Sequence, residues 1–192
     1  MSSETSRLFR RIVRVIVKSA DEAKIAALNG LEASLKKRIF TDGRDSGGGS
    51  IGSYSTRPMY VSIAGAQARY GSQLKSSALT AVGKNGDTEF KNGKKRKSQY
   101  FTDGYAGFRA QVGRQNQKVD LNLTGNLQDS LAGGVTDKGL ALAFINADGA
   151  TLSEHLEQRY GEVFTPTDDE VEEVLNTIED TIFDAILREV QT

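Results

Sequence analysis

Apolar residues recur at helical spacing at both ends of this 192-residue chain. Near the amino terminus, Ser19 followed by Glu22 has the pattern of a capping box, and apolar residues then recur every three or four positions, namely Ile25, Leu28, Leu31, Leu35 and Ile39. This pattern predicts a helix over about residues 20–38. The preceding residues 9–17 also fit one helical face, although their β-branched side chains would suit a strand equally well, and we favour a helix.

The carboxy-terminal part of the chain has the clearest helical pattern. Thr167 and Glu170 form a capping box, and the acids at 168–170 would lie at the positive end of the helix dipole. An apolar stripe of more than five turns follows, namely Val171, Val174, Leu175, Ile178, Ile182, Ile186 and Val190. Upstream, Thr151 and Glu154 form another capping box, which predicts a short helix that ends at Gly161.

Alternation of apolar and polar positions predicts strands between these helices. The segment 140–145 has a large apolar residue at every second position, and we expect it to form a hairpin with residues 127–135. Residues 118–123 alternate in the same way, which predicts another half-buried strand. Thr124 and Gly125 interrupt that run, and we interpret them as a structural turn at a hinge between two halves of the chain.

The middle of the chain lacks a clear pattern. Residues 41–50 are rich in glycine, aspartate and serine and predict a loop. From 53 to 118, isolated aromatic residues stand among polar ones, which indicates either an extended arm ordered by neighbours or a partly disordered insertion.

These patterns together predict a fold class. We expect one α+β domain over 1–192, in which a small antiparallel sheet packs against long N- and C-terminal helices. The N-terminal helical region spans 8–39, a long Gly-rich loop or arm insertion spans 41–118, and the hairpin with the C-terminal helices spans 119–192.

The composition indicates a protein that depends on partners. Hydrophobic residues make up 38% of the chain, below the roughly 45–50% typical of globular domains, and 20 glycines stand against two prolines. Ordering so flexible a backbone costs conformational entropy that contacts with partners would offset. The chain has no cysteine, which excludes disulfides and thiolate chemistry. The apolar run 12–17 is too short for a signal peptide or membrane span, so we expect no membrane association.

The net charge is zero, yet the charges are segregated along the chain. Basic residues cluster near the amino terminus and again at 91–97, whereas acids dominate from Glu154 onward. Such a molecule can pair head to tail with copies of itself, which is the geometry of rings, although ordinary solvated faces would give the same pattern. The candidate residues for contact with subunits or DNA are Arg10, Arg11, Arg14, Lys94, Lys95, Arg96, Lys97, Tyr105, Phe108 and Arg109.

The sequence shows no convincing catalytic or metal-binding pattern. Gly47, Gly49 and Gly52 match G-x-G-x-x-G, but a predicted helix rather than a strand precedes them, so a dinucleotide site is not expected. His155 is the only histidine and lies beside acids on a short predicted helix, which favours a surface residue over a metal ligand. Neither a phosphate-binding Gly-Lys-Ser/Thr nor a Gly-x-Ser-x-Gly motif occurs. We therefore expect no enzyme, cofactor or metal, and an enzyme centred on His155 is a remote alternative.

Several short motifs resemble one known family. In order, they are Ile39-Phe40-x-x-Gly43, Ile51-Gly52-x-Tyr54-Ser55, Tyr100-Phe101-x-x-Gly104-Tyr105-x-x-Phe108-Arg109, Val119-x-Leu121-x-Leu123-Thr124-Gly125-x-Leu127-x-x-Ser130 and Gly161-x-x-Phe164-x-x-Thr167-x-x-Glu170. This order resembles the tail-completion or virion-morphogenesis proteins of tailed bacteriophages, the head–tail connector or neck proteins, from about residue 36 onward. The long stretch at 53–118 departs from shorter relatives and leaves the ring position open.

The resemblance implies a structural virion protein at the head–tail neck or tail end. Such proteins form a ring, here of six or twelve copies, that DNA passes through and that contacts other neck, tail or portal-side proteins. The implied location is the virion, with the host cytoplasm during assembly. The alternative is a non-specific nucleic-acid-binding module that uses the basic and aromatic arm.

Overall fold

The computed structural model describes residues 3–62, 85–89, 95–137 and 139–191. The chain divides into two compact units. Unit 1 comprises Met1–Gly49 and Leu127–Thr192, and unit 2 comprises Ser50–Asn126. The fold is mixed α+β, with long N- and C-terminal helices packed together and two small antiparallel sheets, which confirms the predicted fold class.

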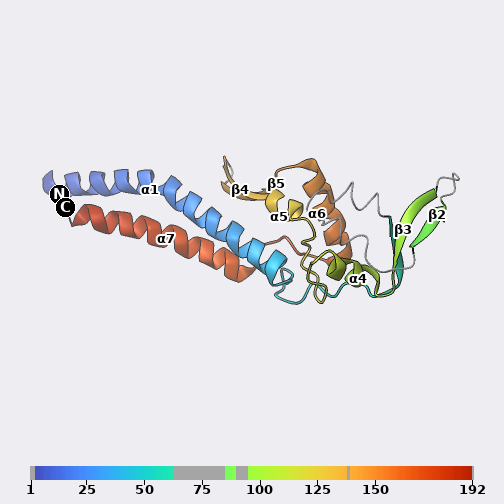
Figure 1. Ribbon diagram of the computed structural model, residues 1–192. Helices are drawn as coiled ribbons and strands as arrows, with labels where there is room; N and C mark the ends of the chain where they lie inside the picture. Colours follow the sequence, from blue (N-terminus) through green and yellow to red (C-terminus); the bar gives the residue numbers. More distant parts are fainter. Residues whose placement is uncertain (1–2, 63–84, 90–94, 138, 192) are drawn as a thin grey trace. The chain divides into compact units, whose positions relative to one another are not determined.

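Unit 1 is built on two long helices that run side by side in opposite directions. Helix α1 (Ser3–Lys36) continues into a short π-helical segment (Lys37–Thr41), and α7 (Asp168–Val190) returns along it. The two chain ends therefore lie at the same end of the pair (Figure 1). Thr167 caps α7, accepting a hydrogen bond from the Glu170 N–H, while the Glu170 carboxylate accepts one from the Thr167 N–H. The predicted capping box and closing helix are confirmed.

Two predicted helix starts are wrong. The residues before Ser19 are helical, as favoured, so Ser19 lies inside α1, where its hydroxyl donates to the carbonyl oxygen of Val15 at 2.9 Å. Helix α6 (Ala147–Tyr160) begins before Thr151, because Asn146 acts as the N-cap and accepts from the N–H of Gly149. Gly161 ends α6 with a positive φ of 80°, as predicted.

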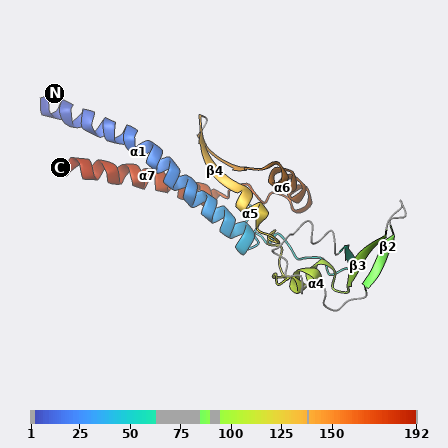
Figure 2. The same ribbon diagram turned by 45° about the horizontal axis from the view of Figure 1, so that its top comes forward.

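A two-stranded hairpin completes unit 1 beside α1 (Figures 1 and 2). Strands β4 (Leu131–Thr136) and β5 (Gly139–Phe144) pair in antiparallel register, which confirms the predicted hairpin. The first part of its predicted first strand is instead the short helix α5 (Asn126–Ser130). The hairpin lies close to α1, since a Cβ added at Gly133 would stand 2.5 Å from Leu28, and the Gly133 N–H donates to Glu32 at 2.9 Å.

The described residues of unit 2 form a three-stranded antiparallel sheet and one helix. Its strands are β1 (Met59–Ser62), β2 (Asn85–Glu89) and β3 (Lys95–Phe101), in the order β1-β3-β2, and α4 (Gly104–Gln111) follows β3. Phe101 and Phe108 form its core and pack edge to face with ring centroids 5.6 Å apart. The described residues of 53–118 thus form a packed core rather than the predicted extended arm, because aromatics isolated in sequence converge in space.

The strand predicted at 118–123 is also absent, since these residues have no regular structure. Val119 is buried as expected, but Leu121 has a positive φ of 49°, which a strand residue does not adopt. The reason is Asp120, whose carboxylate turns inward and accepts the N–H of Asn122 at 3.0 Å. Thr124 and Gly125 form the turn before α5, in which the Asn126 N–H donates to the Thr124 hydroxyl and Gly125 has a φ of 91°.

Candidate functional site: an apolar face on the helical pair

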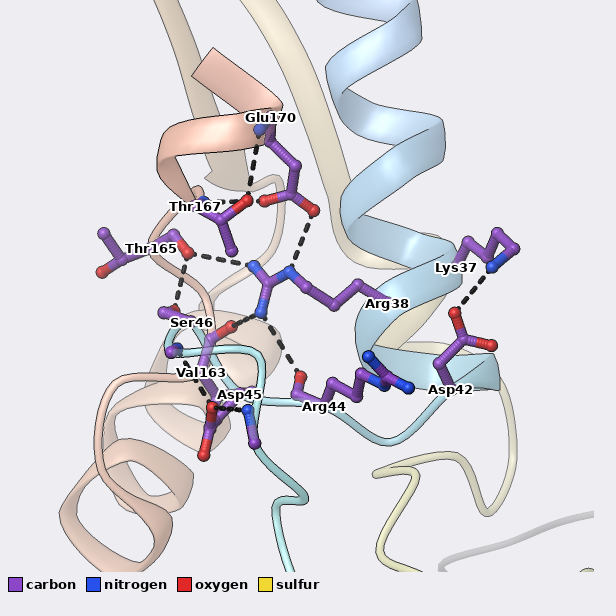
Figure 3. A network of polar contacts seen from close by, with 12 residues as sticks. Lys37, Arg38, Asp42, Arg44, Asp45, Ser46, Val163, Thr165, Thr167 and Glu170 are labelled. Atoms are coloured by element: carbon purple, nitrogen blue, oxygen red, sulfur yellow. Dashed lines mark hydrogen bonds and ion pairs between the residues drawn. The ribbon is translucent and has the colours of Figure 1, made fainter. Parts of the chain in front are cut away.

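The base of the helical pair is held by a buried ion pair (Figure 3). The Nε of Arg38 donates to Glu170 Oε1 at 2.9 Å, and both side chains are about nine-tenths buried. The other guanidinium nitrogens donate to the backbone carbonyls of Val163 at 3.1 Å and Thr165 at 2.9 Å. One planar guanidinium thus fixes the π-helical segment after α1, the segment before α7 and the first turn of α7 in a single arrangement.

The neighbouring glycine loop is also closed by its own contacts. Asp45 Oδ1 accepts the N–H groups of Gly47 at 3.0 Å and Gly49 at 2.9 Å, and the Ser46 hydroxyl donates to the Thr165 carbonyl at 2.6 Å. These are two of the N–H groups that a phosphate would need in a glycine-rich cradle. The G-x-G-x-x-G match is therefore explained by a self-capped loop that fastens to the base of α7 (Figure 3).

The far end of the pair is held much more loosely. Arg11 Nε donates to Glu189 Oε1 at 2.8 Å, and Arg11 Nη2 donates to the Glu189 carbonyl at 2.9 Å. This ion pair is exposed, with 43% and 34% of the two side chains accessible. Together with Arg38–Glu170 at the base, this ion pair limits how far α1 and α7 can shift along each other.

The outer part of the pair buries almost no apolar side chain. Along α7, the only buried residue is Glu170, although the helix is 23 residues long. Between Ser6 and Ala20 of α1, the only buried residue is the polar Ser19. The side chains that face across the pair, such as Ile12 and Ile178, are only half-buried. Two helices alone cannot enclose a core, so most of the apolar surface here is left in water.

Four exposed apolar side chains form a stripe on each helix. On α1, Phe9, Val13, Ile16 and Val17 are 37–70% exposed. On α7, Leu175, Phe183, Leu187 and Val190 are 40–61% exposed. Contiguous apolar surface of this kind is rare on isolated soluble domains and marks sites of interaction.

The two stripes lie on the same side of the pair. Six of the eight stripe residues directly follow a half-buried residue, as Val13 follows Ile12 and Leu175 follows Val174. Because both helices are right-handed and run in opposite directions, the same offset in sequence turns both stripes toward one side. We call these eight side chains, Phe9, Val13, Ile16, Val17, Leu175, Phe183, Leu187 and Val190, the arm face.

The arm face continues a surface that is covered elsewhere in unit 1. Counting on from Val13 and Val17 in steps of three or four leads to Leu28, Leu31 and Leu35 in the second half of α1. There the β4–β5 hairpin lies beside the helix, and Leu28 and Leu35 are buried. The same side of α1 is therefore covered in one half and exposed in the other.

The predicted contact residues fall in three different places. Arg10, Arg11 and Arg14 are exposed on the outer half of α1, where Arg10 borders the arm face seven residues before Val17, and Arg11 is paired with Glu189 in the same chain. Lys94 lies outside the described residues, and the backbone of Lys95, Arg96 and Lys97 forms the start of β3. The sheet register places Lys95 opposite Glu89, and Lys97 opposite Asp87.

Phe108 and Arg109 belong to the interior of unit 2 rather than to a contact surface, and Tyr105 is half-buried beside them. Phe108 and Arg109 are each only 1% exposed, and Tyr105 packs against Phe108. Such burial leaves neither Phe108 nor Arg109 available to another chain or to DNA. Sequence reasoning missed this because aromatic and basic residues in a polar segment have the same pattern whether they line a surface or close a small core.

Arg109 forms a buried polar cluster with Asp120 and Tyr54. Arg109 Nη2 donates to Asp120 Oδ1 at 2.8 Å, and its guanidinium carbon lies 4.1 Å from the centre of the Tyr54 ring. The Tyr54 hydroxyl donates to the same Asp120 oxygen at 2.8 Å. Burial raises the pKa of the Tyr54 hydroxyl well above its ordinary value, so that it stays protonated and keeps donating. The cluster fixes the loop 118–123 in unit 2.

The described residues include neither a candidate metal site nor a helix that could span a membrane. His155 is exposed on α6, and no group of three or more His, Cys, Asp or Glu in the described ranges is placed to hold a metal ion. Of the helices that the structure describes, none is both long and apolar enough to cross a bilayer. No family model, curated protein or solved structure matches this chain. The function proposed below therefore rests on the chain's own residues.

Proposed function

We propose that this chain is a structural virion protein of a tailed bacteriophage. In this role, copies of the chain form an oligomeric ring of six or twelve subunits at the head–tail neck or tail end, as a tail-completion or connector protein that DNA passes through. Neck, tail and portal-side proteins are its other partners. The protein acts by interlocking rather than by catalysis, in the virion and, during assembly, in the host cytoplasm.

The arm face is the observation that supports an assembly role. A helix of 23 residues with no buried apolar side chain gains little from burial within its own chain. Since helical stability in proteins comes mainly from packing an amphipathic face, α7 and the outer half of α1 require a further surface. A subunit whose core is completed by its neighbours has this property, and the motif order described above agrees with the neck family.

The buried polar groups fit a structural role as well. The buried ion pairs of the described residues are Arg38–Glu170, which joins segments 132 residues apart, and Arg109–Asp120, which ties α4 to the loop that follows it. Both arginines donate hydrogen bonds to backbone carbonyls as well as to their paired carboxylates, and these bonds fix the local structure.

Native mass spectrometry and electron microscopy of the purified chain, together with analysis of purified phage particles, test this proposal. We expect ring-shaped oligomers and the presence of the chain in particles. A chain that stays strictly monomeric and is absent from purified particles would overturn the proposal.

The alternative nucleic-acid role rests on the basic segment of β3. Three consecutive basic residues, Lys95 to Lys97, could neutralise phosphates, but the register sets the acids Asp87 and Glu89 opposite the two lysines. Two acids against three bases leave a small excess of positive charge for a phosphate backbone. Steeply salt-dependent DNA affinity that is lost when 94–97 are replaced by glutamates would favour this alternative over the structural role.

A further inference from the structure

We propose that the arm face of unit 1 is the docking surface for the arm face of a second copy, and that the two pairs of helices form a four-helix bundle. In this bundle both arms point the same way, and α1 of each copy lies against α7 of the other. The inference concerns a pairwise contact and goes beyond the ring of the proposed function, because it specifies which surface meets which.

The size of the arm face suits such a dimer. Its eight side chains are roughly half exposed, and fully burying an aliphatic or aromatic side chain removes about 100 Å² of apolar surface, so each copy would bury about 400 Å². Two copies would bury about 800 Å² of apolar surface, which corresponds to a total interface of about 1,300 Å² at the usual apolar share. That area lies in the range of stable protein–protein interfaces, about 1,200–2,000 Å².

The distribution of charge selects the arrangement. The outer half of α1 carries five bases, namely Arg7, Arg10, Arg11, Arg14 and Lys18, whereas the outer half of α7 carries mainly acids, namely Glu179, Asp180, Asp184 and Glu189. If α1 lay against α1 of the second copy, these bases would face each other across a distance too short for salt to screen them fully. When α1 lies against α7, every neighbouring pair of helices combines a basic with an acidic one.

The levels of the residues then predict a specific contact. Arg11 pairs with Glu189 and Arg38 pairs with Glu170, so counting along the antiparallel helices places Val17 level with the segment 183–191 of α7. Phe183 is the most exposed apolar residue of that segment, which makes Val17 and Phe183 the expected contact. These side chains are 70% and 58% exposed. A two-fold axis along the arm keeps each residue at its level, so Val17 of one copy would pack against Phe183 of the other.

Site-directed cross-linking tests this contact directly, because the natural chain has no cysteine. We expect the single variants Val17→Cys and Phe183→Cys, mixed and oxidised, to give a mixed disulfide dimer as the main product, since such a bond forms only between close Cβ atoms. Each variant alone should give several-fold less dimer. The control mixture Arg14→Cys with Asp184→Cys, on the charged side, should give only a background amount.

Sedimentation equilibrium of the full-length chain supplies a second readout. Below the protein concentration at which rings assemble, we expect a species of twice the 20.8 kDa monomer mass. This dimer should be lost in Val17→Lys and Phe183→Lys, whereas Arg14→Gln keeps it. Circular dichroism checks that the lysine variants retain their helices. A monomeric natural chain, or cross-linking of Val17→Cys mainly to itself, would overturn the inference.

The outcomes separate this inference from the proposed function. A chain present in phage particles but without the Val17–Phe183 cross-link contradicts the dimer and leaves the virion role in place. A chain that gives the cross-link but is absent from particles contradicts the virion role and leaves the dimer in place.

Discussion

Replacing Arg38 by methionine tests how the two long helices are joined at their base. Methionine keeps much of the side-chain volume but removes the charge and every donor, which leaves the Glu170 carboxylate buried without its cation. Removing one partner of a buried ion pair costs about 3–5 kcal/mol. The Val163 and Thr165 carbonyls also lose their donor, so we expect Arg38→Met to lower the free energy of unfolding by an amount in the upper part of that range.

A matched control exists at the other end of the same helices. Arg11→Met removes a guanidinium from the Glu189 pair, which is 43% and 34% exposed, so solvent screening limits the expected loss to about 0–1 kcal/mol. Urea unfolding followed by far-ultraviolet circular dichroism measures both, at one fixed protein concentration because association adds to apparent stability.

A double variant separates the lost charge balance from the lost packing. Arg38→Met combined with Glu170→Leu removes both charges, so it should lose less stability than Arg38→Met alone, because no uncompensated charge stays buried. If Arg38→Met cost no more than Arg11→Met, burial of the base pair would not be what joins the helices, and the reasoning would be refuted.

Three further predictions concern the β4–β5 hairpin and unit 2. Hydrogen bonds from Lys36 and the Gly133 N–H hold the pKa of Glu32 below its ordinary 4.5. The ionised carboxylate therefore stabilises the fold fully above pH 4.5, and this contribution is lost as the pH falls through the lower pKa of the folded state. Glu32→Gln should reduce the loss of stability that denaturant titration measures below about pH 5. Gly104→Ala should destabilise unit 2 more than Gly113→Ala, as measured by limited proteolysis. Both glycines have a positive φ, which costs a residue with a Cβ about 1–2 kcal/mol, but only at Gly104 would the Cβ meet backbone carbonyls. Equal effects of the two variants would contradict the role of that contact. Arg109→Met should lower the stability of unit 2 by about 3–5 kcal/mol, since it leaves a buried carboxylate unpaired, and unchanged protease resistance would contradict this.

The sequence predicts the elements of unit 1 well because each has a local signal. The capping box at Thr167 and the long stripe after it mark α7, and the alternation in 140–145 marks β5. The helix starts predicted at Ser19 and Thr151 were wrong because a hydroxyl followed by an acid three residues later also occurs inside helices. There the hydroxyl can donate to a carbonyl one turn earlier, as Ser19 does.

Unit 2 could not be predicted because its signals are not local. Tyr54 joins Arg109 and Asp120 from a segment 66 residues before Asp120, and no local pattern predicts that the three side chains meet. The polar position between Val119 and Leu121 has the pattern of a solvent-facing strand residue, yet Asp120 is the buried partner of Arg109.

The sequence predicted the two apolar sides that make up the arm face, but not their common orientation. The stripe along α7 predicted a helix with an apolar side, and the aliphatic residues at 9–17 fitted a helical face. That these two sides turn the same way follows from the antiparallel packing of α1 and α7 (Figure 2), and among the described residues of unit 1 their side chains stay exposed.

Hydrogen exchange measured at two protein concentrations tests the central claim, that the helical pair is completed by another copy of the chain. Amides of α7 and of residues 8–20 should exchange several-fold more slowly in the concentrated sample, because association stabilises the state in which they are bonded. Amides of α4 in unit 2 serve as the internal reference and should exchange equally in both samples. Equal exchange of α7 at both concentrations, in a chain that remains folded, would contradict the account.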